Sequence, residues 1–289
     1  MINDAVLSKA PLGLRLYVKV LRGVFLLLRP FSTLSGKLAV RLFTTPKRKQ
    51  ASRWERDFEQ RGKVSHVTVA GNALRLLTHG SGPKTVLLMH GWGGRASQMG
   101  SFAEAFVAAG YKVVSVDGPA HGGSSGKSSD LIGFSQAVAG VVAHLQGVEA
   151  IVGHSLGAAS TLLALSQHTL DVKKLVLVSC FSDGVFITEE FGRFFRVGRD
   201  GMQAMRNQME THYNHTVTWQ GISPRATIKD CTQPVLLIHD RDDEDTPFQQ
   251  TLELQVSYPA ASVFATDNAG HYQILRDARA INTAVAFVK

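Results

Sequence analysis

The chain has 289 residues, and 44% of them are hydrophobic, which is enough for a large buried core and too many for a disordered chain. Its two cysteines, Cys180 and Cys231, lie far apart in the sequence, which argues against a disulfide scaffold or a cysteine-rich zinc site and fits a reducing, cytoplasmic compartment. The net charge of +8 is uneven, because residues 1–63 contain 14 lysines and arginines against four acidic residues, whereas residues 64–289 contain 17 against 19. The main body is therefore not a uniformly basic surface, and we expect no nucleic-acid partner.

Residues 1–63 are predicted to form a basic, apolar helical segment distinct from the body at 64–289. Within it, residues 12–29 are mostly apolar, and their four charged residues are Arg15, Lys19, Arg22 and Arg29. On a helix, these four side chains fall within about 80° of one another and form one narrow basic stripe. No uncharged run here is long enough for a transmembrane helix, and the charges break the apolar block of a secretory signal. Two interpretations stay open. The helix lies peripherally on the inner, anionic face of a membrane, assisted by the basic residues at 46–49, or it packs on the body or on a second subunit.

From residue 64 the chain alternates strand-like runs with helix-like stretches. The first two runs, 64–71 and 73–80, predict a hairpin. Six continuous apolar runs follow, each ending at a turn signal, as expected for strands buried on both faces: 85–90, 112–117, 149–154, 174–179, 234–240 and 261–267. Helical patterns separate most of them, at 101–110, 131–146 and 156–168, and a last one closes the chain at 277–289. The alternation predicts an α/β fold with a mostly parallel eight-stranded sheet flanked by helices.

A long gap separates the run that ends near Ser179 from the run that starts at Pro234. It contains the helix-like stretches 185–195 and 200–213. We interpret it as a small helical cap, inserted after the sixth strand at about residues 181–230. Its phenylalanines either line an apolar acyl pocket or hold the cap on the body: Phe181, Phe186, Phe191, Phe194 and Phe195.

Ser155 lies in the stretch IVGHSLGAAS (151–160), after a predicted strand and before a predicted helix. This context is typical of a nucleophile elbow, a sharp turn that lifts the serine hydroxyl out of the sheet. Gly153 and Gly157 fit it because the strand and the helix cross so closely that side chains two positions either side of the serine would clash. The turn also places the hydroxyl at a helix N-terminus, where amide donors favour anionic intermediates.

A nucleophilic serine needs a base, and the base needs a group that orients it. His271 follows the last predicted strand, in the stretch NAGHYQIL, and Asp243 follows the strand before it, in IHDRDDEDTPF. The order Ser155, Asp243, His271 is the one expected with this type of elbow. All three residues come after the carboxyl ends of strands, where active groups gather in open α/β sheets.

Several separate motifs in residues 64–289 resemble the α/β-hydrolase superfamily, and within it the esterase- and lipase-like serine hydrolases with a helical cap. HGWGG (90–94) resembles the oxyanion loop of the family, and DGPAHG (117–122) resembles the turn after its fourth strand. DEDTP (243–247) matches its acid loop, in which the acid lies four residues before a proline. The resemblance implies a catalytic triad of Ser155, His271 and Asp243, with the backbone amides of Trp92 and Leu156 as the oxyanion hole.

The chain departs from the family pattern at three positions. Ala120 and Asp240 stand where many members have glycine, and Thr246 stands in place of the usual valine. Several acidic residues crowd the acid loop, and the proline spacing favours Asp243 among them. Some α/β-hydrolases carry the acid after the sixth strand instead, which makes Asp183 the alternative.

The resemblance implies a hydrolase that cleaves a carboxylic ester of a small or medium apolar substrate through an acyl-enzyme, without a cofactor or a metal. The same triad also serves thioesterases and carbon–carbon bond hydrolases, so both stay open. A further alternative is of another class: a non-catalytic, membrane-docked binding protein that keeps the fold without turnover.

Overall fold

The computed structural model describes residues 7, 10–48 and 50–289, and the chain divides into two compact units. The first unit combines the described residues up to Thr45 with Asp183–Ser223. The second unit combines Pro46–Ser182 with Pro224–Lys289. It contains every strand of the described chain and all of the candidate catalytic residues, apart from the alternative acid Asp183.

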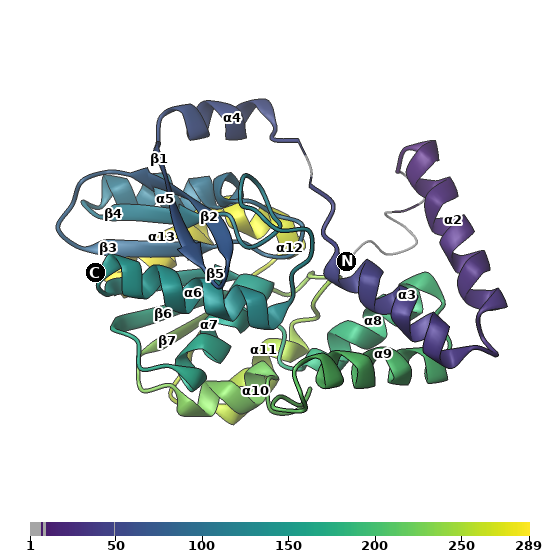
Figure 1. Ribbon diagram of the computed structural model, residues 1–289. Helices are drawn as coiled ribbons and strands as arrows, with labels where there is room; N and C mark the ends of the chain where they lie inside the picture. The colour runs from purple at the N-terminus through teal and green to yellow at the C-terminus, as the bar shows by residue number, and fades with distance from the viewer. Residues whose placement is uncertain (1–6, 8–9, 49) are drawn as a thin grey trace. The chain divides into compact units, whose positions relative to one another are not determined.

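The second unit is built on one sheet of eight strands in the order β1-β2-β4-β3-β5-β6-β7-β8 (Figure 1). β1 pairs with β2, and β2 with β4, in antiparallel register, whereas every other pair is parallel. This confirms the predicted mostly parallel eight-stranded sheet. The strands are β1 (Lys63–Val69), β2 (Asn72–His79), β3 (Thr85–Met89), β4 (Lys112–Val116), β5 (Val148–His154), β6 (Val172–Val178), β7 (Val235–Asp240) and β8 (Ser262–Thr266).

Helices cover both faces of this sheet, as the continuous apolar runs predict. Alternate strand residues such as Val86 and Leu88 join Phe102 of α5 (Gly100–Ala108) and Ile281 of α13 (Ala278–Val288) in one core. The intervening residues, such as Leu87, are equally buried and point to the opposite face. Packed together on that second face are α6 (Leu131–Leu145) and α7 (Leu156–Gln167) (Figure 1).

Shorter helices complete the second unit. α4 (Arg53–Gln60) starts with a capping box, in which Ser52 and Glu55 exchange backbone-to-side-chain hydrogen bonds. α11 lies between β7 and β8 in the chain, and α12 directly follows the turn after β8. The remaining bounds are η1 (Ala96–Met99), α10 (Pro224–Thr227), η2 (Ile228–Asp230), α11 (Gln249–Ser257), α12 (Gly270–Gln273) and η3 (Ile274–Arg276).

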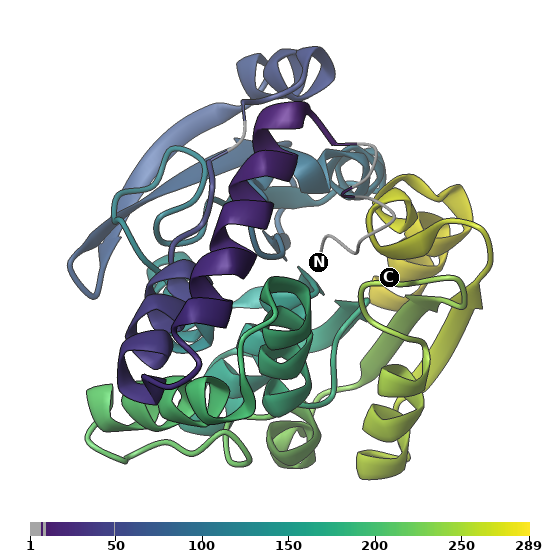
Figure 2. The same cartoon turned by 90° about the vertical axis from the view of Figure 1, so that its right-hand side faces the viewer.

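Among its described residues, the first unit contains the helices α2 (Leu12–Leu27), α3 (Ser32–Thr44), α8 (Gly184–Phe195) and α9 (Arg199–His212). α3 lies along α9 in both views (Figures 1 and 2), and they come so close that a Cβ atom added at Gly36 would lie 2.8 Å from the Cβ of Ala204. α2 packs on α8, where Arg22 Nε donates to Phe194 O at 2.8 Å. None of the helices in the described part of the chain has the length and apolar character needed to cross a membrane.

Phenylalanines of the predicted cap contact the N-terminal helices within this unit. The ring of Phe195 lies 6.4 Å from that of Phe25 in α2, and the ring of Phe191 lies 5.3 Å from that of Phe43 in α3. These contacts join two segments that the sequence presents as separate.

Candidate active site

Ser155 lies on the sharp turn between β5 and α7. Its φ of 52° is in the left-handed region, which costs free energy for any residue other than glycine. The two neighbouring glycines leave no room for a side chain: a Cβ atom added at Gly153 would lie 2.6 Å from Ala158 Cα, and one at Gly157 would lie 2.4 Å from Met89 O. The turn therefore has the strained strand-to-helix geometry of a nucleophile elbow.

His271 and Asp243 form a buried hydrogen-bonded pair. His271 Nδ1 donates to Asp243 Oδ2 at 2.7 Å, and in the neutral ring this leaves Nε2 as the acceptor nitrogen, the atom a general base would use. The other oxygen, Oδ1, accepts the backbone N–H groups of Asp245 at 2.9 Å and Thr246 at 2.8 Å. The carboxylate is thus held rigidly toward the imidazole.

A second histidine, His239 at the end of β7, also contacts this carboxylate. Its Nε2 lies 2.7 Å from Thr246 O and 3.3 Å from Asp243 Oδ2, and its Nδ1 lies 2.6 Å from Thr251 Oγ1. Burial acts to raise the pKa of Asp243, but the hydrogen bonds from His239 and His271 outweigh it, and the pKa is lowered. Asp243 is therefore ionised at neutral pH.

Contacts around His154 bring the His271 turn to the Ser155 elbow. His154, which directly precedes Ser155, donates from Nε2 to the backbone oxygen of His271 at 2.9 Å, and the two rings lie 4.8 Å apart. Gly91 also approaches the elbow closely, since a Cβ atom added there would lie 3.1 Å from the Cβ of Ser155. Thus the elbow, the histidine turn and the start of the HGWGG loop meet at one place.

The HGWGG loop is tied to the loop that follows β4 by two buried histidines. Gly93 N donates to His121 Nε2 at 3.0 Å, and Gly118 N donates to His90 Nε2 at 2.9 Å. Burial lowers the pKa of both rings, that of His121 to about 3, so both are neutral and able to accept these hydrogen bonds at neutral pH. The backbone at Trp92 is thereby fixed on both sides.

The two residues of the predicted oxyanion hole lie in the HGWGG loop and directly after the Ser155 elbow. Trp92 follows Gly91 and precedes the anchored Gly93, and its side chain is 38% exposed. Leu156 is the first residue of α7, so its N–H has no acceptor within the helix.

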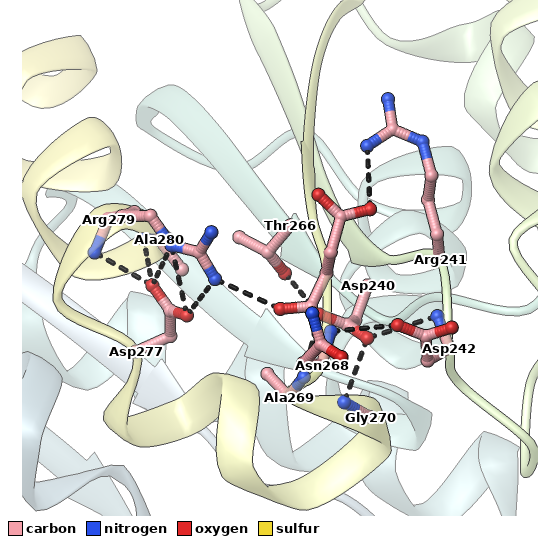
Figure 3. Close-up of polar contacts among 11 residues, drawn as sticks. Asp240, Arg241, Asp242, Thr266, Asn268, Ala269, Gly270, Asp277, Arg279 and Ala280 are labelled. Carbon is pink, nitrogen blue, oxygen red and sulfur yellow. Dashed lines mark hydrogen bonds and ion pairs between the residues drawn. The ribbon is translucent and has the colours of Figure 1, made fainter.

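Asp240 holds the turn before His271 in place (Figure 3). Its fully buried carboxylate accepts the backbone N–H of Gly270 at 2.9 Å and of Ala269 at 3.1 Å, as well as the hydroxyl of Thr266 at 2.7 Å. It also accepts the N–H of Asp242, in the acid loop, at 3.0 Å. One carboxylate thus links the acid loop to the histidine turn.

The alternative acid, Asp183, has a different environment. Its Oδ1 accepts the N–H of Val185 at 2.7 Å and caps the start of α8 in the first unit. This capping role accounts for an acid at that position.

Sequence reasoning selected Ser155, Asp243 and His271 as candidates, and the structure places the last two in direct contact. Three residues that position the loops of the site were not singled out: His239, which contacts the acid, His121, which binds the HGWGG loop, and Asp240, which binds the histidine turn. The substitution of Asp240 for the usual glycine was the one available signal, because a buried carboxylate must find donors.

The model of the α/β hydrolase family matches residues 86–284, more than half of the chain. The chain belongs to the α/β hydrolase family.

Named relatives and solved structures agree with this assignment. A 2-hydroxy-6-oxononadienedioate/2-hydroxy-6-oxononatrienedioate hydrolase of Cupriavidus pinatubonensis is 27% identical over 274 residues, covering 78% of this chain and 94% of the relative. An esterase structure from Pyrococcus furiosus is similar in fold, with a TM-score of 0.64 and 17% identity over 85% of this chain and 96% of the esterase. A putative lipase from Acinetobacter baumannii gives a TM-score of 0.63 and 20% identity, covering 84% and 97% of the two chains.

Proposed function

We propose that the chain is a serine hydrolase that cleaves a carboxylic ester of a small or medium apolar substrate. The observation that carries the proposal is the buried His271–Asp243 pair, held beside a turn on which Ser155 takes a positive φ. A serine on a strained elbow and an imidazole oriented by a carboxylate are the two parts that nucleophilic acyl transfer requires.

In the proposed reaction Ser155 Oγ attacks the acyl carbon while His271 Nε2 takes the hydroxyl proton. The imidazole then passes this proton to the leaving alkoxide, and the acyl group stays on Ser155 as an ester. Water, deprotonated by His271, attacks this acyl-enzyme, and His271 returns the proton to Ser155 Oγ as the acid leaves. Asp243 keeps the imidazole oriented and stabilises its charged form, for which its lowered pKa suits it.

The amides of Trp92 and Leu156 are proposed to hold the oxyanion that forms in each step. Support comes from the close approach of Gly91 to Ser155 and from the position of Leu156 at the start of α7. Fixed backbone donors cost no reorganisation during the reaction, which is why such a site stabilises the transition state.

Hydrolysis of a carbon–carbon bond by the same three residues is the second candidate. It is favoured by the 27% identity to relatives named for 2-hydroxy-6-oxononadienedioate hydrolysis, in Cupriavidus pinatubonensis and Dechloromonas aromatica. A chain-length series of chromogenic acyl esters and thioesters, assayed beside 2-hydroxy-6-oxononadienedioate, separates these candidates by the substrate with the highest kcat/KM.

A fluorophosphonate probe tests the proposed nucleophile directly. We expect the wild type to be labelled and Ser155→Ala to be unlabelled, with kcat reduced by on the order of 10⁴-fold or more. Ser166→Ala, on the same helix, is the matched control and should be labelled like the wild type. A folded wild-type sample that takes no label contradicts the proposal and favours a binding protein without turnover.

We also propose where the reaction takes place: in the cytoplasm, with the chain docked peripherally on the inner face of a membrane through part of residues 12–49. The support is the charge of the N-terminal region, since residues 12–45 contain six basic residues and no acidic residue. Vesicle binding measured for the purified chain tests this location independently of any activity.

A further inference from the structure

Exposed large hydrophobic side chains are concentrated in one short stretch of the first unit. Of the thirteen such residues in the described chain, eight lie between positions 12 and 34: Leu12, Leu16, Tyr17, Val20, Leu26, Leu27, Phe31 and Leu34. Soluble chains scatter exposed apolar residues singly, so a concentration of this kind marks a surface that another apolar phase covers.

Four of these residues form one face of α2, the purple helix in Figure 2. They are Leu12, Leu16, Val20 and Leu27, which are 67%, 52%, 64% and 77% exposed. At 100° per residue, these four side chains fall within about 80° of one another around the helix. The opposite side of the helix carries the buried Val18 and Phe25, and Phe25 contacts Phe195 of α8. Packing within the first unit therefore uses one side of α2 and leaves the apolar face uncovered.

Basic residues border this apolar face. On the helix, Lys19 lies about 20° from Leu12, and Arg15 about 40° beyond Lys19. Residues 12–45 include no acid, so every charged side chain of α2 and α3 is basic. Such a border attracts an anionic surface and repels the same face of a second copy of the chain.

We infer that the apolar face of α2, formed by Leu12, Leu16, Val20 and Leu27, docks into an anionic phospholipid bilayer. The helix lies in the plane of the membrane, with this face among the upper acyl chains and with Lys19 and Arg15 at the level of the phosphates. The inference rests on the proposed peripheral location of the chain and is independent of the proposed hydrolysis.

Arg48, within the predicted membrane-binding range 12–49, is engaged elsewhere. Arg48 donates to the backbone oxygens of Gly122 at 3.0 Å, Ser124 at 2.7 Å and Gly126 at 3.2 Å, all within the second unit. Its guanidinium is thus engaged in holding a loop of the body, and Lys49 lies outside the described residues. The docking surface is therefore narrower than the predicted range 12–49.

Flotation of the full-length chain with vesicles tests the inference. The vesicles are phosphatidylcholine alone or phosphatidylcholine mixed with phosphatidylglycerol, each at low and high salt. We expect binding to the anionic vesicles that weakens with salt. The double variant Leu16→Gln/Val20→Gln keeps helix-forming residues and should bind at least about tenfold more weakly, since two apolar side chains no longer leave water.

The chain offers a closely matched control. Leu252 and Val256 are also an exposed leucine and valine four residues apart on a helix, α11 of the second unit. Leu252→Gln/Val256→Gln should bind vesicles like the wild type, and Arg15→Gln/Lys19→Gln should lose the preference for anionic lipid. Circular dichroism verifies that each variant remains folded.

Three outcomes overturn the inference. Equal vesicle binding by Leu16→Gln/Val20→Gln and the wild type shows that another surface docks, although the peripheral location stands. Absence of wild-type binding overturns the location as well. A dimer in light scattering that dissociates in Leu16→Gln/Val20→Gln, without vesicle binding, identifies a second copy as the occupant. Ester hydrolysis and fluorophosphonate labelling of the same samples report separately on the proposed reaction.

Discussion

At the scale of single residues, Asp240 acts on His271 through the backbone. Four donors converge on its buried carboxylate, two of them the N–H groups of Ala269 and Gly270, which immediately precede His271. Burial acts to raise the pKa of Asp240, but the hydrogen bonds from Thr266 and the backbone outweigh it, and the pKa is lowered. A glycine at this position could not hold the turn in this way.

We expect Asp240→Asn to lower kcat by roughly tenfold to a hundredfold while KM changes little. The asparagine amide replaces one acceptor oxygen by an NH₂ group, so donors that now face a carboxylate would face another donor. The His271 turn would shift, and small misplacements of a catalytic group reduce kcat by this order. Steady-state kinetics on the best ester substrate measures the effect.

Asp242→Asn is the matched control, because Asp242 lies in the same loop but is exposed, and its Oδ2 accepts the N–H of Asn268 at 2.8 Å. The kcat of Asp242→Asn should stay near the wild-type value. If Asp240→Asn is folded and as active as the wild type, Asp240 does not position the histidine.

The residues of the site differ in how far the sequence reveals them. The proline spacing and the chain order favour Asp243 and His271, because both signals can be read directly along the sequence. The roles of His121 and Asp240 depend on donors from segments that are distant in sequence, Gly93 and Gly270. Such contacts exist only after the loops have been brought together, so no local pattern announces them.

At the scale of elements, the elbow depends on the close approach of α7 to the carboxyl end of β3, the neighbour of β5 in the sheet. A Cβ atom added at Gly157 would meet backbone atoms: Met89 O at 2.4 Å and His90 O at 2.7 Å. Backbone at the carboxyl end of a central strand cannot move aside as a flexible side chain can. The glycine is therefore required by packing, whatever the chemistry of Ser155.

We expect Gly157→Ala to reduce the free energy of unfolding by about 1–3 kcal/mol, as overpacking of a dense core does. Gly133→Ala in α6 is the matched control, since the nearest atom to its added Cβ is Ser129 Oγ at an ordinary 3.4 Å. That variant should be neutral or up to about 1 kcal/mol more stable, because alanine favours the helix. Urea unfolding measures both, and equal stability of the two variants would contradict the close approach of α7 to the end of β3.

Strands were easier to predict than some helices, for a physical reason. A strand buried on both faces is a continuous apolar run, and each predicted run matches a strand of the sheet. α11 was not predicted, because it buries only Gln250, Thr251 and Leu254. A helix that buries so little apolar surface has a weak hydrophobic period.

At the scale of the whole molecule, segments far apart in the chain share one unit. α2 and α3 precede the sheet, whereas α8 and α9 are inserted after its sixth strand, yet all four pack together. Composition and periodicity predict helices in both segments. Their pairing was not predictable, because it depends on complementary surfaces such as Gly36 against Ala204, which a single sequence does not display.

The second unit buries several histidines in neutral form, and this makes stability sensitive to acid. Burial, followed by the charge of His271, lowers the pKa of His154 to about 3, and burial with the charge of His90 lowers that of His121 to about 3. In the unfolded chain these imidazoles take up a proton near their ordinary pKa of about 6.5. The unfolded state therefore binds more protons between pH 6.5 and 3, and stability falls as the pH falls through that range.

The acid sensitivity can be assigned to one residue with a neutral replacement. His154→Gln can still donate to the backbone oxygen of His271 but has no proton to gain. Each buried neutral histidine contributes a slope of up to about 1.4 kcal/mol per pH unit. Between pH 6 and 4 we therefore expect the free energy of unfolding to fall less steeply in His154→Gln than in the wild type, by about 1 kcal/mol per pH unit.

His66→Gln, which replaces an exposed histidine of β1, should keep the wild-type slope. Urea titrations at a series of pH values give the three slopes, and parallel lines for the wild type and His154→Gln would show that His154 is not buried as a neutral ring.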